Sequence, residues 1–124
     1  MILVDTSVWV DHLRQGDAAL ADLLQRSAVL MHPFIAGELA CGSLRERAVT
    51  LGLLRNLPAA KVATDAEVQH LIEHHALHGR GIGYVDMHLL ASVRLSSGAS
   101  LWTRDRRLRQ VAERLGCAWR GAAH

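Results

Sequence analysis

The chain has 124 residues, of which 50% are hydrophobic, 21% charged and 4% aromatic. This length fits one domain with a buried core, which excludes a two-domain protein and a disordered chain. The net charge of +2 does not by itself indicate nucleic-acid binding, and the few aromatic residues argue against binding RNA mainly by base stacking. No apolar run approaches the roughly 20 residues of a membrane span, and the N-terminus does not resemble a signal peptide. We therefore expect one soluble cytoplasmic domain over residues 1–124, with Cys41 and Cys117 as reduced thiols.

Short apolar runs alternate with helical patterns along the chain, which is typical of a parallel sheet with crossover helices. The expected strands are residues 2–5, 28–32 and 99–103, with a weaker one at 58–62. The pattern predicts a three-layer α/β/α sandwich.

The expected helices carry recognisable start and stop signals. Thr6 and Ser7 offer N-cap hydroxyls, Pro33 suits a first helical position, and Thr64 with Glu67 forms a capping box. After the helix that follows Ser7, the expected helices are 17–26, 34–41, 45–56, a segment from Thr64 to about residue 78, 84–97 and 104–115.

Four acidic residues are placed to meet at one edge of such a sheet, because ligands of open parallel sheets bind beyond the carboxyl ends of the strands. Asp5 ends the first strand, and Asp105 follows the last one by two residues. Glu38 and Asp86 fall on the apolar arcs of their helices, where a carboxylate is costly unless something pairs with it. Clustered carboxylates repel unless a cation neutralises them, and an oxygen-only set suits Mg²⁺ or Mn²⁺ rather than zinc.

Helix capping offers an ordinary explanation for some of these acids. An Asp after a strand is a common cap or turn residue, and this reading suffices for Asp5 and Asp105 taken singly. It does not explain Glu38 and Asp86 on apolar arcs.

The chain resembles the PIN-domain nucleases, and within them the VapC-type toxins of bacterial toxin–antitoxin pairs. The resemblance spans nearly the whole chain in order and spacing. The matching stretches are Asp5-Thr6-Ser7-Val8-Trp9, Gly37-Glu38-Leu39, Tyr84-Val85-Asp86 with Leu89-Leu90-Ala91, and Leu101-Trp102-Thr103-Arg104-Asp105.

The resemblance implies a PIN-like parallel sheet of four to five strands and an endoribonuclease that depends on Mg²⁺ or Mn²⁺. Its catalytic, metal-binding quartet would be Asp5, Glu38, Asp86 and Asp105. In that family a metal-bound water attacks the phosphodiester in line and leaves a 5′-phosphate and a 3′-hydroxyl. Ser7 and Thr103 match small hydroxyl positions that help order the site.

One departure from the family concerns the end of the motif around Asp105. Many relatives carry another acid two residues further on, where this chain has Arg107. Arg107 forms a basic run with Arg104 and Arg106. This run either binds RNA phosphates or is a solvated helix face.

The resemblance also implies partners. The first is a VapB-type antitoxin, whose arginine would compete with the metal for the carboxylates. The others are a second copy of the chain, which would form a homodimer, and a structured tRNA or ribosomal RNA as substrate. The loop of residues 79–83, with Arg80, is a candidate contact for substrate or partner.

Several other readings compete with the nuclease. A haloacid-dehalogenase-like phosphatase is disfavoured because it would need an Asp where Ser7 stands. A response-regulator receiver is disfavoured because it would need a lysine at the end of a late strand, and Lys61 is the only lysine. A P-loop nucleotide-binding protein is disfavoured because the sequence has no phosphate-binding P-loop motif. His70, His74 and His78 share a helical stripe with Glu67 that either binds a transition metal or is a polar face, and His75 falls among apolar residues. A PIN-like module that binds RNA or protein without cutting it remains the alternative to an enzyme.

Overall fold

The computed structural model describes residues 1–121, so the last three residues of the expected domain lie outside the described part. The strands β1 (Ile2–Val4), β2 (Val29–Leu30) and β3 (Ser100–Trp102) are parallel in the order β2-β1-β3. Leu3 of β1 pairs with Leu30 on one side and with Leu101 on the other. The expected three-layer α/β sandwich is confirmed, but the described residues form three strands rather than four to five.

The missing strands are reduced to single bridges at the two edges of the sheet. Met31 forms an isolated parallel bridge with Ala59, and Leu101 forms one with Ala118. Pro58 has no amide N–H to donate, and its carbonyl accepts the Met31 N–H at 2.7 Å. The expected strand at 58–62 is therefore reduced to a single β-bridge.

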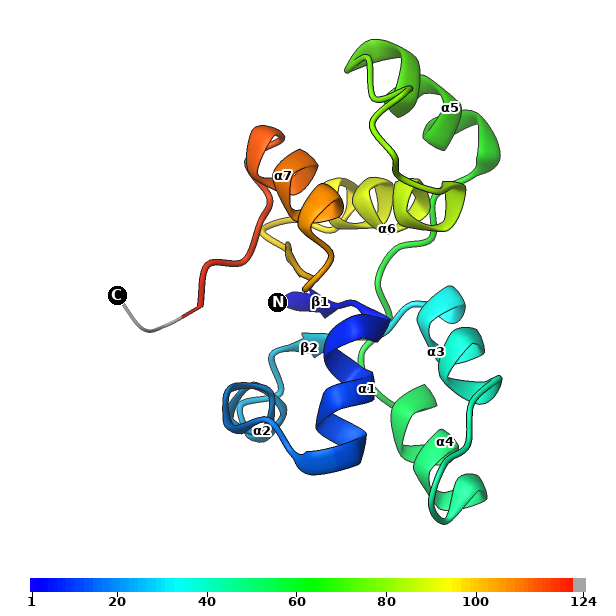
Figure 1. The fold of residues 1–124 in the computed structure, drawn as a ribbon, viewed down its shortest axis with the longest axis vertical. Helices are drawn as coiled ribbons and strands as arrows, with labels where there is room; N and C mark the ends of the chain where they lie inside the picture. Colours follow the sequence, from blue (N-terminus) through cyan, green and yellow to red (C-terminus); the bar gives the residue numbers. More distant parts are fainter. Residues whose placement is uncertain (122–124) are drawn as a thin grey trace.

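Seven helices of the described chain surround the sheet. They are α1 (Thr6–Gln15), α2 (Ala18–Gln25), α3 (Pro33–Ala40), α4 (Arg47–Arg55), α5 (Asp65–His74), α6 (Tyr84–Leu95) and α7 (Arg106–Arg114). In Figure 1, α1 and α2 lie on one side of the sheet and α6 and α7 on the other, while α5 packs on α6 and α3 packs against both α1 and α4. No helix among residues 1–121 is long and apolar enough to cross a membrane.

The helix starts expected from local sequence are confirmed at two helices, α3 and α5, and differ from the structure at two others, α1 and α7. Pro33 begins α3 behind His32, and the Thr64–Glu67 capping box of α5 is complete. The N-cap of α1 is Asp5, not Thr6 or Ser7, and Asp105 caps α7, so Arg104 precedes that helix instead of belonging to it. An aspartate carboxylate competes well for the free N–H groups of a helix start.

Helix α5 ends one turn earlier than expected. It stops at His74, and Ala76 then adopts a left-handed backbone with φ 52°. This turn brings Leu77 into the core, where it is fully buried. His78 is consequently off the helix, and the expected stripe of three histidines does not form.

The core lies on both faces of the short sheet. Its fully buried side chains include Leu3, Trp9, Leu20, Leu89, Leu101 and Leu108. Cys117 is buried and Cys41 exposed, and both are free thiols, as expected. Because β1 pairs with a strand on each side, the sheet fixes the position of Asp5, the residue that follows β1.

Candidate active site

Asp5 follows the central strand and is fixed by three donors. The backbone N–H of Thr6 donates to Oδ1 at 2.8 Å, while the hydroxyls of Ser7 and Thr103 donate to Oδ2 at 3.0 and 2.7 Å. Asp5 is only 7% exposed. These hydroxyls and the N–H of the helix start are the donors that a buried carboxylate requires. The structure therefore places both expected supporting hydroxyls on Asp5.

Glu38 reaches the same region from the middle of α3. The Thr6 hydroxyl donates to its Oε1 at 2.7 Å and so connects α1 to α3. The expectation that Glu38 lies on a buried face is wrong, because its side chain is exposed, as is that of Phe34. Thr6, expected only as a helix cap, therefore also holds Glu38 through its hydroxyl, next to Asp5 in the Asp5-Thr6-Ser7 stretch.

Asp105 enters as the N-cap of α7. Its Oδ1 accepts the Leu108 N–H at 2.9 Å, and its own N–H donates to the Thr103 hydroxyl oxygen at 3.0 Å. The Thr103 hydroxyl thus donates to Asp5 and accepts from Asp105, which ties the ends of β1 and β3 together.

Asp86, in the first turn of α6, is the fourth carboxylate. Its side chain is half-buried, and no donor among residues 1–121 bonds to its carboxylate. Burial raises the pKa of Asp86 to about 6, and the negative charges of Asp5, Asp105 and Glu38 add to the rise. Four acids from four separate parts of the chain therefore lie near one another at the carboxyl ends of the strands.

We call Asp5, Glu38, Asp86 and Asp105 the carboxylate cluster. Their oxygens are ligands of the kind that a hard cation prefers, but the four carboxylates do not converge on a single point. No three acidic, histidine or cysteine side chains in the described part of the chain stand in a metal-holding arrangement. Asp5 and Glu38 accept hydrogen bonds from hydroxyl groups instead. The half-buried Asp86 without a donor and the oxygen-only ligand set nevertheless fit Mg²⁺ or Mn²⁺.

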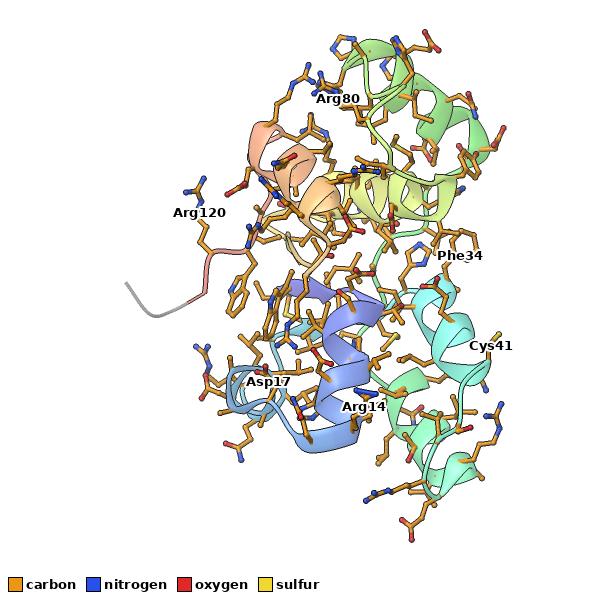
Figure 2. The ribbon with its side chains drawn as sticks, viewed as in Figure 1. Arg14, Asp17, Phe34, Cys41, Arg80 and Arg120 are labelled. Atoms are coloured by element: carbon orange, nitrogen blue, oxygen red, sulfur yellow. The ribbon has the colours of Figure 1, made fainter. Side chains whose placement is uncertain are left out.

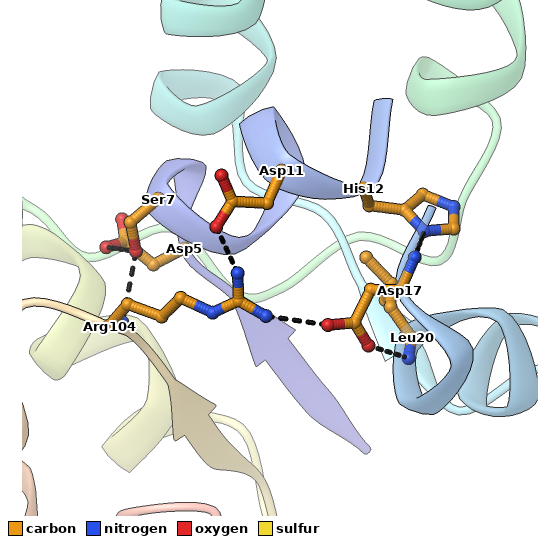
Figure 3. A network of polar contacts seen from close by, with 7 residues as sticks. All are labelled: Asp5, Ser7, Asp11, His12, Asp17, Leu20 and Arg104. Atoms are coloured by element: carbon orange, nitrogen blue, oxygen red, sulfur yellow. Dashed lines mark hydrogen bonds and ion pairs between the residues drawn. The ribbon is translucent and has the colours of Figure 1, made fainter. Parts of the chain in front are cut away.

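Beside this cluster Arg104 forms ion pairs. Its guanidinium pairs with Asp11 of α1 and, at 2.6 Å, with Asp17 at the start of α2, as Figure 3 shows. Its backbone N–H donates to the Ser7 hydroxyl at 3.1 Å. Arg104 therefore connects the end of β3 to α1 and α2. Sequence analysis missed Asp11 and Asp17 because nothing local marks them as its partners.

Arg106 and Arg107, the other two members of the expected basic run, are exposed in the first turn of α7. The structure gives neither of them a carboxylate partner within the described residues. They remain available to a phosphate, in contrast to Arg104.

Two groups of histidines form ring contacts in the structure. His70 and His74 stack with ring centroids 5.4 Å apart, and His75 contacts His74 edge-on at the end of α5. His75 is half-buried beyond the helix, not part of its apolar face. Together with the displacement of His78, this leaves an exposed pair of histidines on α5 in place of the three-residue stripe, which removes the arrangement on which a transition-metal site there would depend.

A second group, which sequence analysis missed, joins α3 to α6. The Phe34 ring contacts His32 and His88 edge-on, at centroid distances of 5.0 and 4.9 Å. His32 is fully buried and accepts the Phe34 N–H on Nδ1 at 3.0 Å. Burial, with the nearby His88, lowers the pKa of His32 to about 4, so this ring is neutral at pH 7. These contacts set the position of α3, and hence of Glu38, against α6, which carries Asp86.

Comparison with known proteins agrees with this geometry. The model of the PIN domain matches residues 2–114, a range that contains all four carboxylates. The chain belongs to the PIN-domain family. Ribonuclease VapC32 from each of two strains of Mycobacterium tuberculosis is 50% identical to it over 118 residues, which is 95% of either chain. Identity of this extent makes the chain a PIN-domain protein of the VapC type and confirms the resemblance seen in its motifs.

Proposed function

We propose that this PIN-domain protein is an endoribonuclease that depends on Mg²⁺ or Mn²⁺ and serves as the toxin of a toxin–antitoxin pair. Its relatives from Mycobacterium tuberculosis are named ribonuclease VapC32, which supports RNA cleavage. The observation that carries the site assignment is Asp86, a half-buried carboxylate without a donor beside three further acids. Such a group is stable near neutral pH once a cation balances the charge.

Asp5, Glu38, Asp86 and Asp105 would hold the cation. A divalent ion bound there supplies positive charge to the phosphate and lowers the pKa of a coordinated water. Asp5 is the most firmly placed ligand, since Ser7 and Thr103 hold one of its oxygens. Glu38 and Asp105 flank it and are accessible to substrate.

The chain's own cations would position the RNA. Arg106 and Arg107 follow Asp105 directly and are free to contact phosphates flanking the cut. Arg104 was expected to join them, but its pairing with Asp11 and Asp17 suits a structural role better. The proposed substrate is a structured RNA such as tRNA or ribosomal RNA.

The proposal includes the partners typical of a VapC-type toxin. A VapB-type antitoxin would silence the enzyme by inserting an arginine among the carboxylates, where it competes with the metal. We further propose that residues 1–124 act as one PIN domain, that two copies form a homodimer, and that the pair works in the cytoplasm.

Cleavage of total cellular RNA by the purified, antitoxin-free chain tests the function. The assay compares Mg²⁺, Mn²⁺ and EDTA, and the wild type with Asp86→Asn. Asp86 is the informative position because no protein donor depends on its charge, whereas Asp5→Asn would also disturb three hydrogen bonds. Discrete fragments with 5′-phosphates that require metal and Asp86 are expected. Binding of RNA by the wild type without any cleavage would contradict the enzyme and favour the non-catalytic binding module.

A further inference from the structure

A basic cavity opens between α7 and the segment that connects α5 to α6. Its polar lining consists of His78, Arg80, Arg107, Gln110 and Arg114. Arg80 lies at the outer end of this region in Figure 2. No acidic residue lines the cavity, so it is a concave surface with one sign of charge.

Two of the three arginines of this basic cavity donate to backbone carbonyls, and none of the three forms an ion pair with a carboxylate of the described residues. Arg80 Nε donates to the Ala76 carbonyl at 3.4 Å, and an Nη of Arg114 donates to the His75 carbonyl at 3.1 Å. The ion pairs within residues 1–121 involve Arg26 and Arg104 and none of the cavity arginines. Their remaining N–H groups are therefore free for an anion, which would also relieve the repulsion between them.

Arg107 packs directly over Gly81 in a way that requires a glycine there. The backbone of Gly81 has φ +74°, and a Cβ at this position would stand 2.6 Å from Nη1 and 2.9 Å from Cδ of Arg107. Both contacts are closer than real Cβ atoms allow. The glycine thus permits the guanidinium to lie against the loop and form the cavity wall.

Two elements connect the basic cavity to residues of the carboxylate cluster. Arg107 lies two residues after Asp105 on the same helix start, and Gly81 lies just before α6, which carries Asp86 in its first turn. Because α7 begins at the Asp105 cap and continues along the cavity, this helix connects the two sites.

We propose that this basic cavity binds a backbone phosphate of the RNA, adjacent to the phosphodiester that is cut. The guanidinium groups of Arg80 and Arg107 grip its oxygens, with Arg114 and His78 completing the cavity. The inference rests on the proposed function and adds a second anchoring point for the same strand. It assigns the phosphate contact to the cavity instead of to the arginine run as a whole.

The test is RNA binding by the double variant Arg80→Gln/Arg107→Gln. The probe is a short fluorescein-labelled single-stranded RNA of mixed sequence, titrated in EDTA so that no cleavage occurs, over a series of salt concentrations. Losing one bound phosphate lowers the slope of log K against log salt by about 0.7. We expect that change together with roughly tenfold weaker binding.

Three further variants make this test specific. Arg55→Gln, at the last residue of α4, removes an exposed charge that does not line the cavity and should leave the slope unchanged. Arg80→Lys/Arg107→Lys keeps the charge and should restore the slope. Gly81→Ala keeps every arginine but displaces Arg107, and should weaken binding; thermal melting checks that each variant is folded.

The outcomes separate this inference from the proposed function. A wild type that cleaves RNA with metal, and a double variant with unchanged slope and affinity, would overturn the cavity assignment alone. A double variant that binds RNA normally but loses affinity for an acidic peptide would also overturn it in favour of a protein partner. A wild type that binds RNA through these arginines but never cleaves it would support the cavity and contradict the nuclease.

Discussion

Thr103 donates its hydroxyl proton to Oδ2 of Asp5 at 2.7 Å, a buried contact between residues 98 positions apart in the sequence. The same oxygen of Thr103 accepts the Asp105 N–H at 3.0 Å. One hydroxyl therefore fixes where two of the four carboxylates stand relative to each other. It does so at the ends of the two neighbouring strands β1 and β3.

Replacing that hydroxyl by a methyl group should misplace both acids. We expect Thr103→Val to lower the free energy of unfolding by about 1–3 kcal/mol, because the buried Asp5 oxygen loses a donor. Cleavage should fall more in kcat than in KM, since the change affects the position of the carboxylates and not RNA binding. Urea unfolding and steady-state kinetics measure the two effects. Thr103→Ser, which keeps the hydroxyl, is the control, and equal losses in both variants would show that the methyl group matters instead.

Asp86→Asn should stabilise the metal-free protein at neutral pH. The pKa of Asp86 is raised from 3.8 to about 6, so between these values the folded state holds a proton that the unfolded state has lost. Its contribution to stability is present below pH 3.8 and disappears as pH rises through about 6. We expect the variant to exceed the wild type by roughly 1–2 kcal/mol above pH 6, a value reduced for partial solvent exposure.

Urea unfolding in EDTA at a series of pH values measures this difference. The gain should vanish below the unfolded-state pKa. A constant gain at every pH would mean that the asparagine packs better and that charge repulsion is not its cause.

His32 should give the opposite dependence on pH. Its pKa is lowered from 6.5 to about 4, so between these values the unfolded state binds a proton and the folded state does not. The stability due to the neutral ring is therefore present above pH 6.5 and is lost as pH falls to about 4. His32→Asn retains an acceptor for the Phe34 N–H but does not titrate.

We expect His32→Asn to be less stable than the wild type at pH 7 by about 1–3 kcal/mol, because it loses buried ring contacts. Its stability should then change less than that of the wild type between pH 6.5 and pH 4. Chemical denaturation of both proteins at the two pH values is the measurement. A wild type and variant with parallel pH profiles would refute the assignment of a buried, neutral His32.

Arg104→Gln should affect stability more than RNA binding. It removes the ion pairs to Asp11 and Asp17, which are partly exposed, so we expect a loss of about 0.5–1 kcal/mol. Because the pKa of Asp17 is lowered, first by the Leu20 N–H and also by Arg104, this contribution should shrink as pH falls below 3.8. Thermal melting and the salt dependence of RNA binding distinguish the two roles. A reduced salt slope with unchanged melting would assign Arg104 to the RNA instead.

The sequence predicted those parts of the fold that depend on local signals. Pro33 and the Thr64–Glu67 capping box mark helix starts with groups next to each other in the chain, and both hold. The quartet was chosen from strand ends and helix faces together with family motifs, and the structure brings its members together. That pattern identified Asp86 as half-buried but wrongly placed Glu38 on a buried face.

The remaining features depend on contacts between distant segments. Arg104 looked like the start of a helical basic run because its partners, Asp11 and Asp17, are 93 and 87 positions away. Helix α5 ends early because burial of Leu77 outweighs the continuing helical pattern. The expected strand at 58–62 shrinks to the single bridge between Met31 and Ala59, beside the two-residue strand β2.

The two isolated bridges at the sheet edges determine how copies of this protein can meet. A sheet edge invites strand addition, domain swapping and fibril growth when it presents a long row of unpaired N–H and C=O groups. Here each edge is covered by a segment that pairs through one residue, Ala59 on one side and Ala118 on the other. Neither segment is long enough to template a further strand, so the edges are protected against aggregation. The proposed homodimer must therefore join through helical surfaces.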